Sequence, residues 1–138
     1  NNITLKNKWK EGPKTYLGIA SEGFPNLFTI SGPGSPSVLT NMIVSIEQHV
    51  NWIFKCFDYM RINKKSSIEV SKKAQDEWGK HNQNVSIDHV RSSCSSWYVG
   101  SNIKGKANTF MPYVGGYANY VKKCNEISEN NYKGFILK

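Results

Sequence analysis

The sequence predicts an α/β fold that begins with one short buried strand, a glycine- and proline-rich loop and a long helix. Two observations lead to this prediction. A short apolar run at residues 27–30 ends at Ser31-Gly32-Pro33-Gly34, which is typical of a strand that stops at a loop. After this loop, apolar residues recur at helical spacing to about residue 63. Hydrophobic residues make up 38% of the 138 residues, which is enough for one domain with a core.

The elements follow one another in a simple order. The stretch up to about Gly23 mixes charged residues with Gly12-Pro13 and predicts a loop with little regular structure. The strand at residues 27–30 comes next. The long helix is then capped by the side chain of Thr40 or Asn41. Its apolar positions are Ile43, Ile46, Val50, Ile53, Phe54, Phe57 and Met60.

A second helix is expected to begin at Ser66, because Ser66 and Glu69 have the spacing of a capping box. Its apolar stripe contains Val70, Ala74 and Trp78. On its wetter face, residues four apart have opposite charges and predict two ion pairs, Glu69–Lys73 and Asp76–Lys80.

Residues 91–112 show no periodicity and predict a long loop, which in a compact domain is often functional. After Gly115-Gly116, a third helix is expected, and residues 132–137 predict a terminal strand. The apolar face of this helix is formed by Tyr117, Tyr120, Val121, Cys124 and Ile127.

The chain is basic, with 18 Lys and Arg against 10 Asp and Glu, a net charge of +8 and a pI near 9.4. Such a surface attracts anions, such as nucleic acid, acidic lipid or a phosphorylated cofactor. The lysines are spread along the chain and no block reaches five like charges, which favours an ordinary solvated surface over a nucleic-acid patch.

The three cysteines, Cys56, Cys94 and Cys124, have neither zinc-ligand nor redox-pair spacing, so we expect free thiols in a reducing cytoplasm. Cys56 and Cys124 fall on apolar helix faces, where a thiol packs as a small hydrophobe. No apolar run of eighteen residues and no leader sequence is present, so no membrane association is expected. The chain begins abruptly at Asn1, as a cropped chain would.

No motif in the chain forms a complete active site. The three histidines, His49, His81 and His89, lack metal-ligand spacing, which favours surface or core roles and predicts no metal. The serine-hydrolase elbow, the Walker motif and the dinucleotide-binding motif G-x-G-x-x-G are absent.

The start of the long helix at Asn41-Met42 is the first candidate site. Ligands of α/β sheets bind at the carboxyl ends of strands, and a helix start offers free N–H groups and a positive partial charge. Such an end suits a phosphate or the negative charge of a reduced flavin. A plain connection between strand and helix explains the same pattern, and the residues alone leave both interpretations open.

Trp97-Tyr98, within a Ser-, Gly- and Asn-rich loop, is the second candidate site. Aromatic side chains on a loop can close over a cofactor and exclude water. They can equally anchor the loop on the core. Lys104 and Lys106 would favour an anionic ligand but do not decide between the two.

Several runs of the sequence resemble the Baeyer–Villiger monooxygenases, and phenylacetone and cyclohexanone monooxygenases in particular. The run from Gly23 to Val50, GFPNLFTISGPGSPSVLTNMIVSIEQHV, is similar to their late flavin-domain segment. The run from Ser96 to Lys106, SWYVGSNIKGK, is similar to their mobile control loop. Residues 9–18, 110–116 and 132–135 match as well, so the resemblance extends nearly from end to end.

The resemblance implies a fold and a division of the chain. Residues 1–64 would be the end of a Rossmann-like FAD-binding domain, with its last strand and C-terminal helix. Residues 65–138 would be a helical extension that carries a cofactor-covering loop at about 91–112, a terminal helix and a strand. Asn41 and Met42 match flavin-binding positions, and Trp97 matches a contact to NADP. The loop that shapes the substrate pocket matches Ser37, Val38 and Leu39.

The resemblance also implies the reaction. The parent enzyme would use NADPH to reduce FAD, capture O2 as a C4a-peroxyflavin and convert a ketone to an ester or lactone. The dinucleotide-binding motifs and the active-site arginine lie upstream in this family, so the fragment contains no catalytic residue and should be inactive without the upstream part of the same polypeptide.

Two alternatives stay open. An N- or S-oxidising flavin monooxygenase of the same superfamily would share this segment, because that discrimination lies upstream. A stand-alone basic nucleic-acid-binding module fits the charge and the seven tyrosines, but RNA-recognition aromatic motifs are absent.

Overall fold

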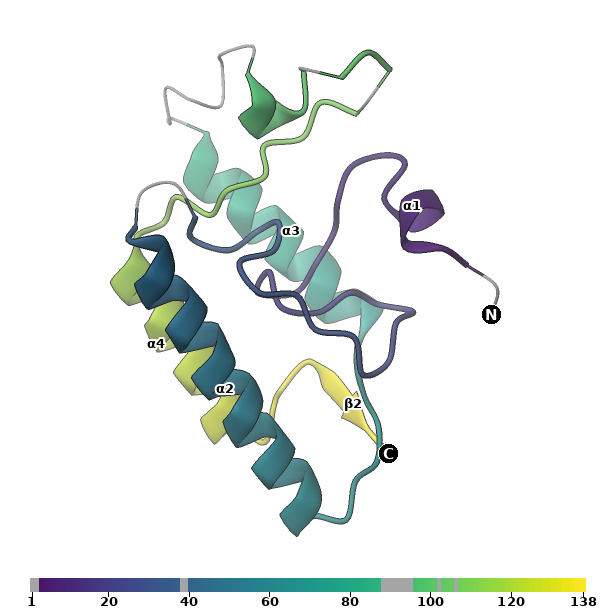
Figure 1. Ribbon diagram of the computed structural model, residues 1–138, viewed down its shortest axis with the longest axis vertical. Helices are drawn as coiled ribbons and strands as arrows, with labels where there is room; N and C mark the ends of the chain where they lie inside the picture. Colours follow the sequence, from purple (N-terminus) through teal and green to yellow (C-terminus); the bar gives the residue numbers. More distant parts are fainter. Residues whose placement is uncertain (1–2, 38–39, 88–95, 102, 106) are drawn as a thin grey trace.

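The computed structural model describes residues 3–37, 40–87, 96–101, 103–105 and 107–138 (Figure 1). Within these residues the fold is mostly helical, with one two-stranded sheet. The elements are α1 (Leu5–Lys8), α2 (Met42–Ile62), β1 (Ile68–Val70), α3 (Lys72–Ser86), the 3-10 turn η2 (Trp97–Val99), α4 (Tyr117–Glu129) and β2 (Phe135–Leu137). No helix in the described ranges is both long and apolar enough to cross a membrane.

One core unites the chain. α2 and α4 lie side by side, and α3 and the small sheet close the core opposite them (Figure 1). The segment at residues 15–21 runs through the centre and is buried throughout, with a single β-bridge between Tyr16 and Ala20. This segment was predicted to be a loop. The segment indeed forms no helix or named strand, but it is buried in the core rather than lying on the surface.

The long helix is confirmed almost to the residue. Asn41 caps α2, and its side-chain Oδ1 accepts a hydrogen bond from the N–H of Ile43 at 3.0 Å. The helix ends at Asn63, whose side chain bonds to the carbonyl of Tyr59 at 2.8 Å. Its buried residues are Ser45, His49, Trp52, Ile53, Cys56 and Met60. The predicted apolar stripe is therefore largely not the buried face.

The strand predicted at residues 27–30 is wrong for this structure. The segment has no regular secondary structure: the N–H of Leu27 bonds to the nearby carbonyl of Phe24 at 3.3 Å, and the N–H of Thr29 bonds to the carbonyl of Ile19 at 2.7 Å. A strand needs a ladder of such bonds to a neighbour. The side chains still pack as expected of an apolar run, since the ring of Phe28 meets that of Phe57 edge to face at 5.4 Å.

The second helix begins later than predicted, because residues 68–70 form β1 and pair antiparallel with β2. Glu69 does not close a capping box; its carboxylate accepts a hydrogen bond from the N–H of Gly23 at 3.0 Å. Ser71 caps α3 instead, through the N–H of Ala74. The ion pairs shift with the helix: Lys72–Asp76 at 2.8 Å and Lys73–Glu77 at 4.0 Å replace the predicted ones.

The last two elements agree with the sequence. α4 buries Tyr120, Cys124 and Ile127 on one face, as predicted, and the terminal strand forms in shorter form as β2. Cys56 and Cys124 are buried free thiols, and burial raises the pKa of each to about 12, so both stay protonated and pack as hydrophobes. Cys94 lies outside the described residues.

Candidate functional site

The glycine–proline loop, residues 31–35, is held by hydrogen bonds along its whole length. Each of its residues uses a backbone N–H or C=O group in a bond to another part of the chain or within the loop. These bonds are Ser31 N–H to His49 Nδ1 at 2.9 Å, Gly32 N–H to Gly18 O at 3.2 Å, Thr15 Oγ1–H to Pro33 O, Gly34 N–H to Met111 O at 2.7 Å and Tyr113 N–H to Ser35 O at 3.0 Å. The loop is therefore a rigid support for the residues that follow it.

Two glycines let the loop pack on the buried central segment. A Cβ atom on Gly32 would lie 2.5 Å from the carbonyl oxygen of Gly18, and a Cβ on Gly18 would lie 2.8 Å from the backbone nitrogen of Ser35. Gly18 also has a φ of +72°, a conformation that favours glycine. The backbones approach so closely that no larger residue fits at either position.

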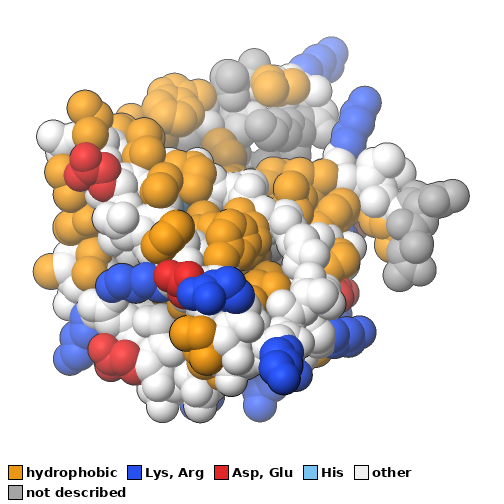
Figure 2. Space-filling view, turned by 60° about the horizontal axis from the view of Figure 1, so that its bottom comes forward, with side chains coloured by type: hydrophobic (Ala, Val, Ile, Leu, Met, Phe, Trp, Pro, Cys, Tyr) orange, Lys and Arg blue, Asp and Glu red, His pale blue; other side chains and the backbone are white. Residues whose placement is uncertain are grey.

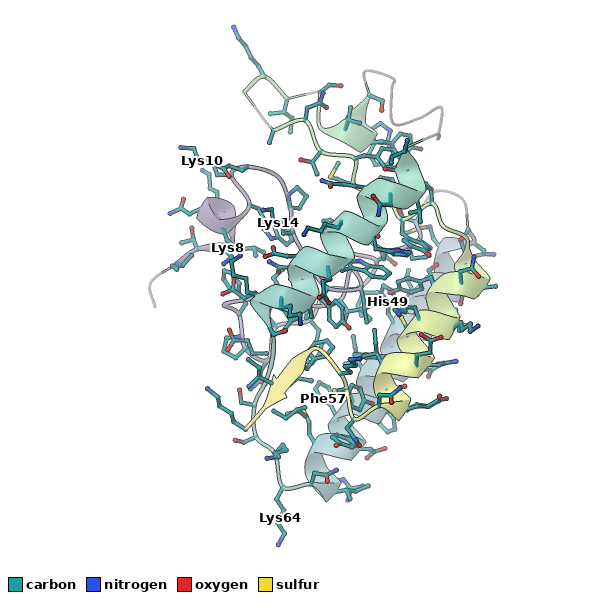
Figure 3. The ribbon with its side chains drawn as sticks, turned by 180° about the vertical axis from the view of Figure 1, so that it is seen from behind. Lys8, Lys10, Lys14, His49, Phe57 and Lys64 are labelled. Atoms are coloured by element: carbon teal, nitrogen blue, oxygen red, sulfur yellow. The ribbon has the colours of Figure 1, made fainter. Side chains whose placement is uncertain are left out.

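A buried polar chain lies directly under this loop. His49 on α2 is fully buried, and its Nδ1 accepts the bond from Ser31. Its Nε2 lies 2.7 Å from the hydroxyl of Tyr120 on α4, and that hydroxyl donates to the carbonyl of Leu17 at 2.6 Å. Figure 3 places His49 among the side chains between the helices. The chain thus connects the loop, α2, α4 and the central segment.

The start of α2 is open to solvent. Asn41 is exposed, Met42 is 43% exposed and Ser37 is half-buried. The first turn of a helix carries N–H groups with no partner inside the helix and a positive partial charge. These residues can therefore donate backbone hydrogen bonds to an anionic group placed over the helix end. Val38 and Leu39, the other predicted pocket residues, lie outside the described residues.

Trp97 does not anchor the loop on the core. It is 57% exposed, and its ring lies 3.9 Å from that of Tyr98, centroid to centroid. The anchor is Val99, which is buried and whose carbonyl accepts a hydrogen bond from the N–H of Thr109 at 3.0 Å. In this structure Val99 therefore anchors the loop, and more than half of the Trp97 side chain is exposed.

The two candidate sites lie toward the same end of the molecule. In Figure 1, α2 begins at the end of the helix pair that is nearer to η2, while its C-terminal end lies far from that loop. The structure also contains a separate cavity of about 450 Å³ that is lined by α3, Thr15, Gly34 and residues 108–111. None of the predicted site residues lines it. The described residues include no cluster of three His, Cys, Asp or Glu side chains that could hold a metal ion.

Comparisons with known proteins show which proteins this chain is similar to. No protein-family model matches the chain. A cyclohexanone 1,2-monooxygenase from Acinetobacter sp. is 36% identical over 99% of this chain and 25% of its own length. A Baeyer–Villiger monooxygenase from Pseudooceanicola batsensis is 35% identical over 97% of this chain and 24% of its own length. The chain is a partial homologue of the Baeyer–Villiger monooxygenases.

Solved structures of similar proteins have the same fold over this segment. An oxidised steroid monooxygenase bound to NADP has a TM-score of 0.91 and 39% identity over 99% of the chain. The OTEMO complex with FAD and NADP has a TM-score of 0.91 and 30% identity over the whole chain. Homologous structures therefore bind both cofactors. The chain spans about a quarter of the length of these proteins and of the curated relatives.

One relative has a different activity. A phenazine N-monooxygenase from Lysobacter antibioticus is 34% identical over 97% of this chain and 24% of its own length. This segment is therefore shared by Baeyer–Villiger and N-oxidising relatives, and it does not by itself distinguish oxygen insertion from N-oxidation.

Sequence reasoning missed the polar chain under the loop. It assigned His49 a surface or core role and placed Tyr120 on an apolar face, which is where both side chains lie. The missed signal is that each places a hydrogen-bonding group on a buried helix face, which requires a partner. The partner of each comes from a distant part of the chain, 71 residues away.

Proposed function

We propose that this chain is the C-terminal part of an FAD- and NADPH-dependent Baeyer–Villiger monooxygenase that converts ketones to esters or lactones. The supporting observation is identity of 35–36% to enzymes of this kind over nearly the whole chain. In this proposal residues 1–64 end the FAD-binding domain, and residues 65–138 form the extension with the cofactor-covering loop. Overall, ketone, O2, NADPH and a proton give ester, NADP⁺ and water.

The surface of α2 supports a partner in the same polypeptide. Beside its buried face, this helix exposes a second row of apolar side chains. Figure 2 shows apolar patches along one side of the molecular surface. The row consists of Ile43, Ile46, Val50, Phe54 and Phe57, of which Phe54 is 65% exposed. A helix that is apolar on two faces is buried in a larger protein. We propose that the remaining three quarters of the flavoprotein covers this row.

FAD fits the start of α2 at one edge only. The exposed first turn at Asn41 and Met42 offers backbone N–H groups, and the hydrogen-bonded loop before it fixes their direction. FAD, when bound, would accept hydride from NADPH and supply activated oxygen to the ketone. The 138 residues contain no G-x-G-x-x-G sequence, so the pyrophosphate must be held by the rest of the protein.

The other predicted residues keep their proposed roles. Ser37, with Val38 and Leu39, would shape the ketone pocket next to the flavin edge. Trp97 would contact NADP, which is supported by its exposure on a loop that Val99 anchors. Both groups follow the resemblance and require the full-length protein to be tested.

The decisive experiment uses the full-length polypeptide that carries this chain. We expect it to purify yellow, to oxidise NADPH in the presence of a cyclic ketone and to form the lactone in proportion to the NADPH consumed. Formation of an N-oxide from an aromatic amine without lactone from any of a panel of ketones would establish the N-oxidising alternative, which the phenazine N-monooxygenase relative favours. A colourless protein that does not oxidise NADPH would contradict both the Baeyer–Villiger and the N-oxidising proposals.

A further inference from the structure

The hydrogen bonds around His49 permit only one proton arrangement. The N–H of Ser31 is a donor, so the Nδ1 atom that faces it at 2.9 Å must be the unprotonated, accepting nitrogen. In neutral imidazole the proton then sits on Nε2 and is donated to the hydroxyl of Tyr120 at 2.7 Å. That hydroxyl is left free to donate to the carbonyl of Leu17.

Burial enforces this arrangement. His49 has no exposed surface, and burial lowers its pKa to about 4, so the ring is neutral at physiological pH. Burial also raises the pKa of Tyr120 well above its usual value of 10, which keeps its hydroxyl protonated and able to donate. The series of hydrogen bonds from the Ser31 N–H to the Leu17 carbonyl is therefore uncharged and directional, and each donor in it has an acceptor.

The bond to Ser31 joins two parts of the chain on either side of the proposed flavin edge. Ser31 is the first residue of the glycine–proline loop, and His49 lies in the second turn of α2. The residues between them include Ser37, Asn41 and Met42. Holding both ends of this segment together fixes where its exposed part points.

We infer that His49 is a positioning residue for the proposed flavin edge: its Nδ1 ties the glycine–proline loop to α2, and Tyr120 selects the tautomer that can do so. This inference rests on the proposed function, since it gives the geometry a role in holding a flavin. A histidine that only fills the core would not depend on which of its two nitrogens is matched.

The two nitrogens can be tested separately in the flavin-loaded full-length protein. His49→Asn places an amide oxygen near the position of Nδ1 and keeps an acceptor for Ser31. His49→Gln places its amide near the position of Nε2 and keeps the contact to Tyr120 but loses the loop. We expect kcat/KM for the ketone to fall about tenfold in His49→Gln and no more than about twofold in His49→Asn, the effect of one lost hydrogen bond. His81 on α3 is an exposed histidine that takes no part in the hydrogen bonds from Ser31 to Leu17, so His81→Asn and His81→Gln are the matched controls.

A second measurement does not depend on activity. Hydrogen exchange of the Ser31 amide should stay slow in His49→Asn and become at least about tenfold faster in His49→Gln, since only the second variant loses the acceptor. Tyr120→Phe should lower the melting temperature and make the Ser31 amide exchange faster than in the wild type, because Nε2–H loses its acceptor and the tautomer with an accepting Nδ1 is no longer selected. These readings hold whether or not the wild-type protein binds flavin, so failure of the proposed function is recognised separately, by a colourless wild-type protein.

Three outcomes would overturn the inference. Equal exchange rates at Ser31 in the two His49 variants would show that Nδ1 does not hold the loop. Normal kinetics in His49→Gln, with faster exchange at Ser31, would show that the loop bond does not serve the flavin edge. A loss confined to His49→Asn would assign the role to the Tyr120 contact instead.

Discussion

Acid should destabilise the chain through His49 more than through any exposed histidine. The unfolded chain titrates this side chain near pH 6.5, whereas burial lowers its folded pKa to about 4. Between these values the unfolded state binds a proton at this ring and the folded state does not. The free energy of unfolding therefore falls as the pH falls from about 6.5 to about 4. Above pH 6.5 the ring is neutral in both states and its contribution is fully present.

The size of this effect follows from the same shift. A difference of about 2.5 pKa units at about 1.4 kcal/mol each gives a loss of about 3 kcal/mol, a large part of the 5–15 kcal/mol that is typical of a domain. Urea unfolding of the 138-residue chain, followed by tryptophan fluorescence at several pH values, measures it. His49→Asn cannot titrate, so its stability should fall less steeply over this range. His81, whose pKa is also lowered by burial, titrates in both proteins and cancels in the comparison.

The same slope in the wild-type chain and in His49→Asn would refute this reasoning. A direct check is the NMR titration of the His49 ring, which should show no protonation above about pH 5. An ordinary titration near pH 6.5 would mean that water reaches the ring and that the hydrogen bond to Ser31 is not maintained.

Three further predictions concern the proposed site and the exposed face of α2. Met42→Pro in the full-length protein removes the N–H proposed to meet the flavin, and because Asn41 has an extended ψ of 117°, a following proline causes no strain. The flavin midpoint potential should fall by the equivalent of about 1.5–3 kcal/mol in a spectroelectrochemical titration. An unchanged potential would mean that Met42 only packs. Trp97→Phe should raise the KM for NADPH about five- to thirtyfold and release more hydrogen peroxide per NADPH, with little change in melting temperature because the side chain is exposed; the reverse pattern would remove Trp97 from the site. Phe54→Glu should reduce aggregation of the isolated chain in light scattering but weaken flavin retention by the full-length protein, whereas Lys55→Glu, a charged neighbour, should do neither.

Local pattern predicted the elements whose residues are adjacent in sequence. α2 and α4 follow from 3.6-residue spacing and from the cap at Asn41. The helix start at Ser66 was wrong because the capping-box pattern is local, whereas β1 is set by its pairing with the distant strand β2. Ile68 pairs with Leu137, 69 residues further along the chain. A distant partner thus overrides a local preference.

The candidate site divides in the same way. Its exposed parts lie in continuous runs of sequence that resemble the family, so Asn41, Met42 and Trp97 could be named from that resemblance. The support beneath them could not, because the contact between His49 and Tyr120 spans 71 residues and the buried segment at residues 15–21 has no periodicity. Gly18 and Gly32 carry no side-chain signal at all, although their contact sets the distance between the loop and the core.

The helix α2 explains why a correct helix prediction gave the wrong buried face. Apolar residues lie on two of its sides, and the apolar pattern selected the side of Ile43, Val50 and Phe57 because every position on it is apolar. The side that this chain buries has the same helical spacing, but it includes the polar residues Ser45 and His49 and so stood out less in the sequence. A pattern reports which faces avoid water in the whole protein, not which are covered by one segment. The exposed row on α2 is therefore itself physical support for a further protein surface that covers this helix, independent of any likeness to a relative.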